Sequence, residues 1–284
     1  MNKTPRRITF ELIRRYVVYL REQERAAHTV QKYTHNLEEL AAYLDGQTVT
    51  KAALIEWKDR LTDAHSPATV NSKITAANGF FTFMGWRDLS LRLLKIQKII
   101  FCDEKRELTR AEYVRLVEAA EQEGNQRLSL VLQTICATGI RVSELRFITV
   151  EAVCVGRAEI FNKGKRRVVF LPDKLRKLLT KYLQAQKKTA GAVFTTRTGK
   201  PLDRSNIWRD MKGLCKSANV EPGKVFPHNL RHLFARTYYS LEKDLSRLAD
   251  ILGHSSINTT RIYTMESGAV HARQMARLGL VLTT

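Results

Sequence analysis

Residues 137–145 read Ala137-Thr138-Gly139-Ile140-Arg141-Val142-Ser143-Glu144-Leu145. They follow residues 128–136, which are almost all apolar, and a run of this kind predicts a buried helix. Gly139 can adopt the left-handed conformation that ends a helix at its C′ position. Because a new helical turn is expected near Arg141, the sequence predicts that this arginine projects from a tightly fixed elbow.

After the elbow, the pattern is a mixture of strands and helices. Residues 159–161 and 167–171 are predicted strands, and Asn162-Lys163-Gly164-Lys165 joins them with a glycine suited to a hairpin turn. A third strand is expected at residues 192–194. Helices are predicted over residues 173–188, 204–218, 227–241, 244–252 and 257–264.

Before the elbow, the N-terminal part of the chain has the period of amphipathic helices. They are expected at residues 10–20, 30–44, 51–61 and 67–84. Thr9 is suited to cap the first of them, and Ser66 followed by Pro67 the last. Four such helices with short links predict a compact bundle.

A change of pattern marks a boundary between two domains. Residues 94–107 have no clean period, whereas Thr109 and Glu112 have the spacing of a capping box. We therefore expect a helical domain at residues 1–93, a linker at 94–107, and a second domain with a C-terminal tail at 108–284. The expected fold is mainly α with a small β-sheet: a helical bundle followed by a mixed α+β domain.

The charge of the chain favours a polyanionic partner. The sequence has 48 Lys and Arg against 28 Asp and Glu, a net charge of +20, and a pI near 10.0. Residues 1–103 contribute +5 (16 basic, 11 acidic) and residues 104–284 contribute +15 (32 basic, 17 acidic). Such an excess favours nucleic acid, because neutralising phosphates releases condensed counterions. A basic protein at a membrane surface is the second interpretation.

Several other classes of protein are not indicated. No apolar run approaches the roughly 20 residues needed to span a bilayer, and the basic N-terminus lacks the apolar segment of a signal peptide. The four cysteines, at positions 102, 136, 154 and 215, have no metal or redox spacing and fit a reducing cytoplasm. Nucleotide-binding glycine motifs and the G-x-S-x-G hydrolase motif are absent from the sequence, so no nucleotide cofactor is expected.

Six residues have the types needed for a phenol to attack a phosphodiester without a metal. They are Arg141, Lys163, His228, Arg231, His254 and Tyr263. Taken singly, each has an ordinary explanation as a surface arginine, a turn lysine, a capping histidine or a core tyrosine. Their joint occurrence favours the chemical interpretation. His228 and His232 have the spacing of zinc ligands, but Asn229 stands where a zinc protease has glutamate, so we expect no metal and assign His232 to packing or hydrogen bonding.

The segments around these residues resemble the motifs of tyrosine recombinases, the Xer and phage-integrase family. The motifs are Ala-Thr-Gly-Ile-Arg141-Val-Ser-Glu-Leu, Asn-Lys163-Gly, His228-x-x-Arg231-His232, Leu-Gly-His254 and Ile-Tyr263. The resemblance extends over nearly the whole chain. It implies a SAM-like core-binding domain followed by a catalytic domain of the DNA breaking-rejoining type.

The resemblance also implies a role for each residue. Tyr263 would attack the scissile phosphate and form a 3′-phosphotyrosyl link. Arg141 and Arg231 would hold the non-bridging oxygens, and Lys163 would protonate the departing 5′-oxygen. His228 would accept the proton of the tyrosine, and His254 would donate a hydrogen bond to the phosphate.

The resemblance further implies double-stranded DNA with inverted-repeat core sites as the partner. It also implies a homotetramer on that DNA, with a Holliday junction as the reaction intermediate. Asn71, Lys73, Arg204 and Asn206 are candidate DNA contacts, although an exposed polar face is the commoner explanation of the first two. No arm-type module is expected before residue 8, and the apolar tail is expected to mediate assembly or to fold back on its own domain.

Two other functions are compatible with the same scaffold. One is a non-catalytic DNA-binding protein, and the other is a type IB topoisomerase. Within the recombinases, a chromosome-dimer resolvase and a mobile-element integrase or invertase are not separated. We expect a cytoplasmic, nucleoid-associated protein of a prokaryote or a mobile element, with no membrane partner.

Overall fold

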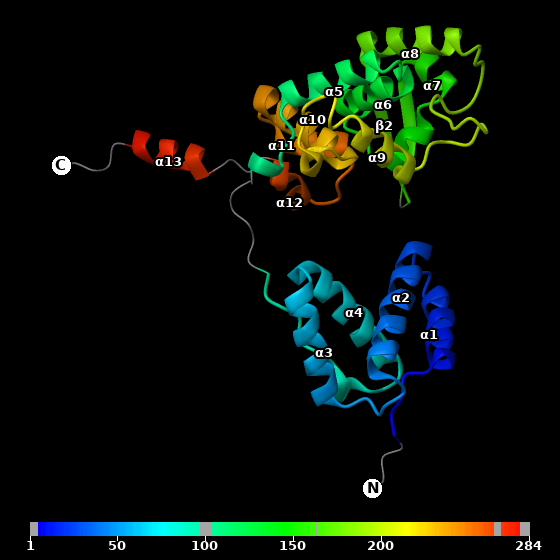
Figure 1. The fold of residues 1–284 in the computed structure, drawn as a ribbon, viewed down its shortest axis with the longest axis vertical. Coiled ribbons are helices and arrows are strands. Elements are labelled where there is room, and N and C mark those ends of the chain that lie inside the picture. The colour runs from blue at the N-terminus through cyan, green and yellow to red at the C-terminus, as the bar shows by residue number, and fades with distance from the viewer. Residues whose placement is uncertain (1–4, 97–103, 163, 264–267, 279–284) are drawn as a thin grey trace, which may run out of the picture. The chain divides into compact units, whose positions relative to one another are not determined.

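The computed structural model describes residues 5–96, 104–162, 164–263 and 268–278 of the chain. Contacts divide the chain into two compact units, Met1–Lys98 and Ile99–Thr284, coloured blue to cyan and green to red in Figure 1. The predicted fold class is confirmed, because the described residues are mainly helical and contain one two-stranded sheet. Cys102 and part of the predicted linker lie outside the described residues.

Unit 1 has four α-helices among its described residues, and local sequence sets the start of three of them. α1 (Phe10–Glu22), α3 (Lys51–Ala64) and α4 (Pro67–Phe83) follow Thr9, Thr50 and Ser66, whose hydroxyl oxygens accept a backbone N–H of the first turn. α2 (Ala27–Leu44) begins before the predicted start at residue 30 and has no side-chain cap.

The core of unit 1 lies around α4. Val70, Ile74, Phe80 and Phe81 are fully buried and pack in one apolar cluster with side chains of α1, α2 and α3. The Tyr16 ring of α1 meets the Phe80 ring edge-on at 5.6 Å between centroids. The apolar face predicted for this helix is therefore confirmed.

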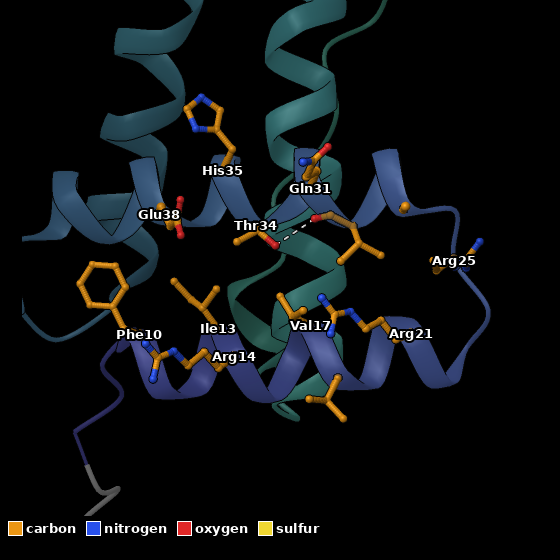
Figure 2. A pocket seen from close by; sticks show the side chains of 13 residues that line it. Phe10, Ile13, Arg14, Val17, Arg21, Arg25, Gln31, Thr34, His35 and Glu38 are labelled. Carbon is orange, nitrogen blue, oxygen red and sulfur yellow. Dashed lines mark hydrogen bonds between the residues drawn. The ribbon is translucent and has the colours of Figure 1, made fainter. Parts of the chain in front are cut away.

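A groove of about 1020 Å³ lies between α1 and α2 (Figure 2). Its lining combines the apolar side chains of Phe10 and Val18 with Arg14, Arg21 and Arg25. Phe10 is 69% exposed and Val18 is 52% exposed. Both apolar surface and positive charge are thus open to solvent on this side of unit 1.

Unit 2 is built around the buried helix α6 (Gln126–Thr138). α6 packs against α5 (Arg110–Gln122), α8 (Asp173–Ala185) and α10 (Pro227–Glu242). α5 begins with a complete capping box, in which Thr109 and Glu112 bond each other's backbone N–H. The predicted buried helix and the predicted capping box are both confirmed.

The elbow after α6 depends on Gly139. This residue ends α6 with φ +65°, and the 3₁₀ helix η3 (Val142–Phe147) begins directly after Arg141. A Cβ on Gly139 would lie 2.3 Å from Cδ1 of Phe234 on α10. Only glycine combines the left-handed backbone with this close approach of α6 and α10.

The hairpin is confirmed, whereas the third strand is wrong. β1 (Arg157–Asn162) pairs antiparallel with β2 (Lys165–Phe170). At the predicted third strand, Ala192 forms only an isolated bridge with Thr149, while Val193 and Phe194 are buried in the core. Burial explains the apolar run there without strand pairing. α7 (Val150–Val155), just after the elbow, was not predicted.

The remaining helices carry or surround the candidate site. Four are α-helical: α9 (Arg204–Gly213), α11 (Leu245–Leu252), α12 (Ile257–Thr260) and α13 (Gly268–Arg277). Three are short 3₁₀ helices: η2 (Glu104–Arg106), η4 (Pro222–Lys224) and η5 (Arg261–Tyr263). The predicted helix at 204–218 ends earlier, and the one at 257–264 is divided into α12 and η5. Within the described part of the chain, no helix is long and apolar enough to span a membrane.

Candidate active site

Arg141 is held at the elbow by Glu144. The backbone N–H of Arg141 donates to Oε2 of Glu144 at 2.8 Å, and Nη1 donates to Oε1 at 2.9 Å. The Glu144 side chain is 1% exposed, whereas the Arg141 side chain is 36% exposed. A buried carboxylate therefore orients a guanidinium that stays open to solvent, which suits the capture of an anionic group.

Arg167 on β2 belongs to the same network and was not identified from the sequence. Its Nη2 donates to Oε2 of Glu144 at 2.5 Å, and its Nη1 donates to the carbonyl of Ile251 at the end of α11. Its stem lies so close to Gly253 that a Cβ there would be 2.7 Å from Cδ of Arg167. Arg167 pairs with the buried Ile160 and so faces the core, but this register comes from the fold and left no signal in the sequence alone.

Arg231 on α10 is 1% exposed and joins three segments of unit 2. Nη1 donates to the carbonyl of Gly139 at 2.6 Å, and Nη2 donates to the carbonyl of Leu252 at 2.8 Å and lies 2.9 Å from Nε2 of His254. Burial and the nearby Arg141 lower the pKa of Arg231 to about 10. The residue remains a cation at neutral pH, fixed where α6, α11 and α12 meet.

Tyr263 lies against this buried cation. It is 3% exposed, and its phenol lies close enough to Arg231 to raise the pKa of that residue in opposition to burial. Its ring meets His232 edge-on, with centroids 4.7 Å apart, and lies nearly parallel to His254 at 5.9 Å. The tyrosine is thus enclosed by one arginine and two histidines.

His228 and His254 are held in their neutral forms. Desolvation, followed by the neighbouring His232, Arg231 and Arg141, lowers the pKa of His228 to about 4. Desolvation followed by the charge of Arg231 likewise lowers the pKa of His254 to about 4. Both rings are therefore uncharged at neutral pH in the absence of an anion.

The neighbours of His254, His228 and His232 decide which ring nitrogens can donate or accept a hydrogen bond. Nδ1 of His254 lies 2.8 Å from Oγ1 of Thr260, and Nε2 faces Arg231, so Nε2 accepts and Nδ1 carries the hydrogen. The rings of His228 and His232 pack edge to face, with centroids 4.6 Å apart. Among the described residues, no group of three or more His, Cys, Asp or Glu side chains could hold a metal ion.

Lys163 lies outside the described residues, so its position is not assigned. The hairpin that carries it is described on both sides: Asn162 and Lys165 pair across the turn, and Gly164 has φ +73°. The remaining five residues named for catalysis are all described in unit 2.

Asn71 and Lys73 of unit 1 both have partners within their own unit. The amide of Asn71 donates to the carbonyl of Leu94 at 2.9 Å and accepts the Leu94 N–H at 2.7 Å. Lys73 forms an ion pair with Glu39 and its side chain is 11% exposed. A DNA contact from either residue would require these bonds to be exchanged.

Arg204 and Asn206 differ in how close they come to the catalytic residues. Arg204, at the exposed start of α9, is near enough to His228 for its charge to lower the pKa of that histidine. Asn206 lies two residues further along α9, with its backbone N–H donating to Oδ1 of Asp203 at 2.7 Å. Arg204 therefore stands beside the site, while the backbone N–H of Asn206 is capped by the side chain of Asp203.

Comparisons with known proteins show which family the chain matches. The phage integrase family matches residues 106–268, and the N-terminal SAM-like domain of phage integrases matches residues 13–88. The tyrosine recombinase XerD of Staphylococcus aureus is 40% identical over 47% of this chain, so the chain spans about half (48%) of that relative's length. The XerD of Xanthomonas campestris pv. campestris is 30% identical over 90% of this chain and 88% of the relative.

A solved structure supports the fold. The crystal structure of a lambda integrase tetramer bound to a Holliday junction has a TM-score of 0.73 with this chain, at 18% identity, and covers 89% of this chain and 76% of that chain. The family match extends over more than half of the residues, and the five described candidate residues lie within it. The chain therefore belongs to the phage integrase family of tyrosine recombinases.

Proposed function

We propose that this chain is a site-specific DNA recombinase that cleaves and rejoins DNA strands with Tyr263. The observation that carries the proposal is the enclosure of this phenol by Arg231, His232 and His254, beside the solvent-open Arg141. A phenol among fixed cations and neutral histidines is suited to attack a phosphodiester. The net charge of +15 on residues 104–284 is suited to hold DNA against it.

In the cleavage step, the phenol oxygen of Tyr263 attacks the scissile phosphorus and the bond to the 5′-oxygen breaks. The phenol proton passes to His228, whose lowered pKa leaves it neutral and able to accept. Lys163 gives a proton to the departing 5′-oxygen. The product is a 3′-phosphotyrosyl link and a free 5′-hydroxyl, and attack by a 5′-hydroxyl in the reverse direction rejoins the strand.

Arg141 and Arg231 are the residues that hold the phosphate in this proposal. Since Nε2 of His254 accepts from Arg231 in the free protein, that contact has to open before His254 can donate to a phosphate oxygen. The ring hydrogen also has to move from Nδ1 to Nε2, after which Nδ1 accepts from the hydroxyl of Thr260. Thr260 then keeps the imidazole in place through the other ring nitrogen. Phosphate binding thus replaces the hydrogen bond between Arg231 and His254 with contacts from the protein to the phosphate oxygens.

We propose a homotetramer on inverted-repeat core sites as the working assembly, with a Holliday junction as intermediate. The support is the similarity of the fold to the lambda integrase tetramer on such a junction. Residues 1–93 would contact DNA as the core-binding domain, and Arg204 would contribute to binding near the cleaved phosphate. The protein would act on DNA in the cytoplasm, on a chromosome or on a mobile element.

The C-terminal tail is the proposed assembly element. Met275 of α13 and Leu278 directly after this helix are exposed, while residues 279–284 lie outside the described part. Deleting residues 272–284 should abolish synapsis of two DNA sites while leaving binding of one site intact, as measured by gel shift. Unchanged synapsis would refute the role in assembly.

A covalent adduct tests the proposed chemistry directly. Nicked duplexes that carry candidate repeats trap the cleaved strand, so wild-type protein should form a complex that resists SDS. Tyr263→Phe should bind the same duplex and form no adduct. An adduct that survives this substitution, or no adduct with wild type on any cognate repeat, would overturn the proposal.

A further inference from the structure

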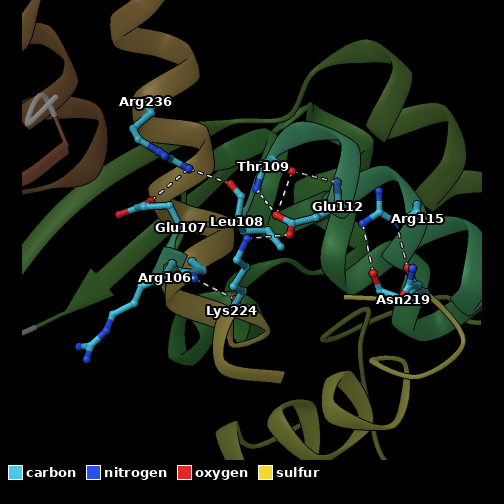
Figure 3. Close-up of polar contacts among 11 residues, drawn as sticks. Arg106, Glu107, Leu108, Thr109, Glu112, Arg115, Asn219, Lys224 and Arg236 are labelled. Atoms are coloured by element: carbon cyan, nitrogen blue, oxygen red, sulfur yellow. Dashed lines mark hydrogen bonds and ion pairs between the residues drawn. The ribbon is translucent and has the colours of Figure 1, made fainter. Parts of the chain in front are cut away.

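Residues 106–108 form a strap along α10, the helix that carries His228 and Arg231. The amide of Asn229 donates to the carbonyl of Arg106 at 2.7 Å, and Nη2 of Arg236 donates to the carbonyl of Leu108 at 2.7 Å. Figure 3 shows Arg236 beside Glu107 and Leu108. The strap therefore binds two points of the helix that lie about two turns apart.

Glu107 lies between these two points and faces His232. Oε1 of Glu107 is 3.5 Å from Nδ1 of His232, and Oε2 is 3.1 Å from Nη2 of Arg236. The side chains of Glu107 and His232 are only 16% and 17% exposed. Asn229, His232 and Arg236 are spaced i, i+3 and i+7, so one face of α10 meets the strap.

The charge state of Glu107 follows from its partners. Burial alone would raise the pKa of its carboxyl, but the nearby His232 and the charge of Arg236 outweigh burial and lower it. The 3.5 Å contact between Nδ1 of His232 and Oε1 of Glu107 is electrostatic, because Nδ1 has no hydrogen-bond partner of good geometry among the described residues. Glu107 is therefore a carboxylate at neutral pH. A carboxylate at this distance favours the orientation in which Nδ1 of His232 points to the strap.

The other side of His232 meets the nucleophile. Its ring is nearly perpendicular to that of Tyr263, at 87°, with 4.7 Å between centroids, and it also packs edge to face on His228. A rotated imidazole would remove this contact and free the tyrosine ring to tilt. Neither Glu107 nor His232 is among the residues to which the proposed chemistry assigns a step.

We propose that Glu107 is a positioning residue for the nucleophile, acting through His232. Its carboxylate fixes the imidazole, and the imidazole fixes the ring of Tyr263 for in-line attack. The inference rests on the proposed function, because it concerns the same tyrosine. A misplacement of about 1 Å at a reacting group can lower a rate by about 100-fold, so loss of the carboxylate should slow cleavage about 10- to 100-fold.

The test is the single-turnover cleavage rate of a nicked duplex at saturating protein. Glu107→Gln should lower this rate about 10- to 100-fold and leave the dissociation constant for the duplex unchanged. Glu107→Asp, which keeps a carboxylate, should recover part of the lost rate. Glu112→Gln is the matched control, because Glu112 forms an ion pair with Lys224 at 2.8 Å near the same strap (Figure 3). Its rate should equal that of wild type.

A double-mutant cycle separates positioning from a purely structural effect. If Glu107 acts through His232, Glu107→Gln should have no further effect on the rate in a His232→Phe background. An equal loss in both backgrounds, or a wild-type rate for Glu107→Gln, would overturn the inference. Wild-type protein that forms no Tyr263 adduct would overturn the proposed function instead, so the two failures are distinguishable.

The step affected is identified with a substrate whose leaving 5′-oxygen is replaced by sulfur. A thiolate leaves without being protonated, so this substrate should restore the rate of Lys163→Ala but not that of Glu107→Gln. Restoration of Glu107→Gln by the sulfur substrate would place its defect in leaving-group protonation, and would refute positioning of the nucleophile.

Discussion

Gly139→Ala should destabilise unit 2 by about 2–5 kcal/mol. Two costs add. A left-handed backbone costs a residue with a Cβ about 1–2 kcal/mol, and Gly139 has φ +65°. The new Cβ would also lie 2.3 Å from Cδ1 of Phe234 and 3.1 Å from Cδ2 of Leu252, an overlap of the kind that costs about 1–3 kcal/mol in a packed core.

Gly156→Ala is the matched control for this substitution. Gly156 has φ +81° and also ends a helix, but its nearest neighbours are side-chain atoms of Arg176 at 3.6 Å, an ordinary contact distance. It should show only the backbone cost of about 1–2 kcal/mol. The difference between the stability losses of the two variants isolates the steric overlap with Phe234 and Leu252.

The assay is native-state hydrogen exchange read by mass spectrometry on peptides of α6 and α10. It reports the free energy of opening for unit 2 separately from unit 1. Phe234→Leu added to Gly139→Ala should recover part of the lost stability. Equal losses for Gly139→Ala and Gly156→Ala, or no recovery in the double variant, would refute the steric reasoning.

Glu144→Gln should lower the strand-cleavage rate about 10- to 100-fold at saturating DNA, because Arg141 and Arg167 lose the carboxylate that orients them; an unchanged rate contradicts this. The pKa of His254 is lowered from 6.5 to about 4, so the unfolded chain binds more protons in that window and stability falls as pH falls through it. His254→Gln should make that decline shallower in urea unfolding at a series of pH values, and an equally steep decline would exclude the effect. Arg204→Ala should reduce the slope of log K against log salt by about 1 in anisotropy titrations with duplex DNA. A slope equal to that of wild type would show that Arg204 contacts no phosphate.

Local signals in the sequence predicted much of the fold. The caps at Thr9 and Ser66 and the capping box at Thr109 each depend on a few neighbouring residues, and all three are present. The elbow at Gly139 was predicted for the same reason. By contrast, α2 has no side-chain cap, so its start at Ala27 left no local signal.

Features that depend on distant partners could not be predicted in the same way. The run at residues 192–194 is apolar because it is buried, and a short apolar run does not distinguish burial from strand pairing. Arg167 acts with Glu144 and Ile251, which are far from it in sequence. The contact between Glu107 and His232 joins residues 125 positions apart (232 − 107), and no spacing rule connects them.

The way the site holds its arginines explains how it can favour a phosphate. Arg231 is fixed by the carbonyls of Gly139 and Leu252, and Arg167 by the carbonyl of Ile251 as well as by Glu144. Carbonyl oxygens orient a guanidinium without neutralising its charge. Burial is the main cause of the lowered pKa values of His228 and His254, and the charges of Arg231 and Arg141 lower them further. In the proposed reaction, a phosphodiester would supply the missing negative charge, and the pentavalent transition state would carry more of it than the ground state. Fixed cations that lack full counterions therefore stabilise the transition state more than the bound substrate, which is the condition for catalysis.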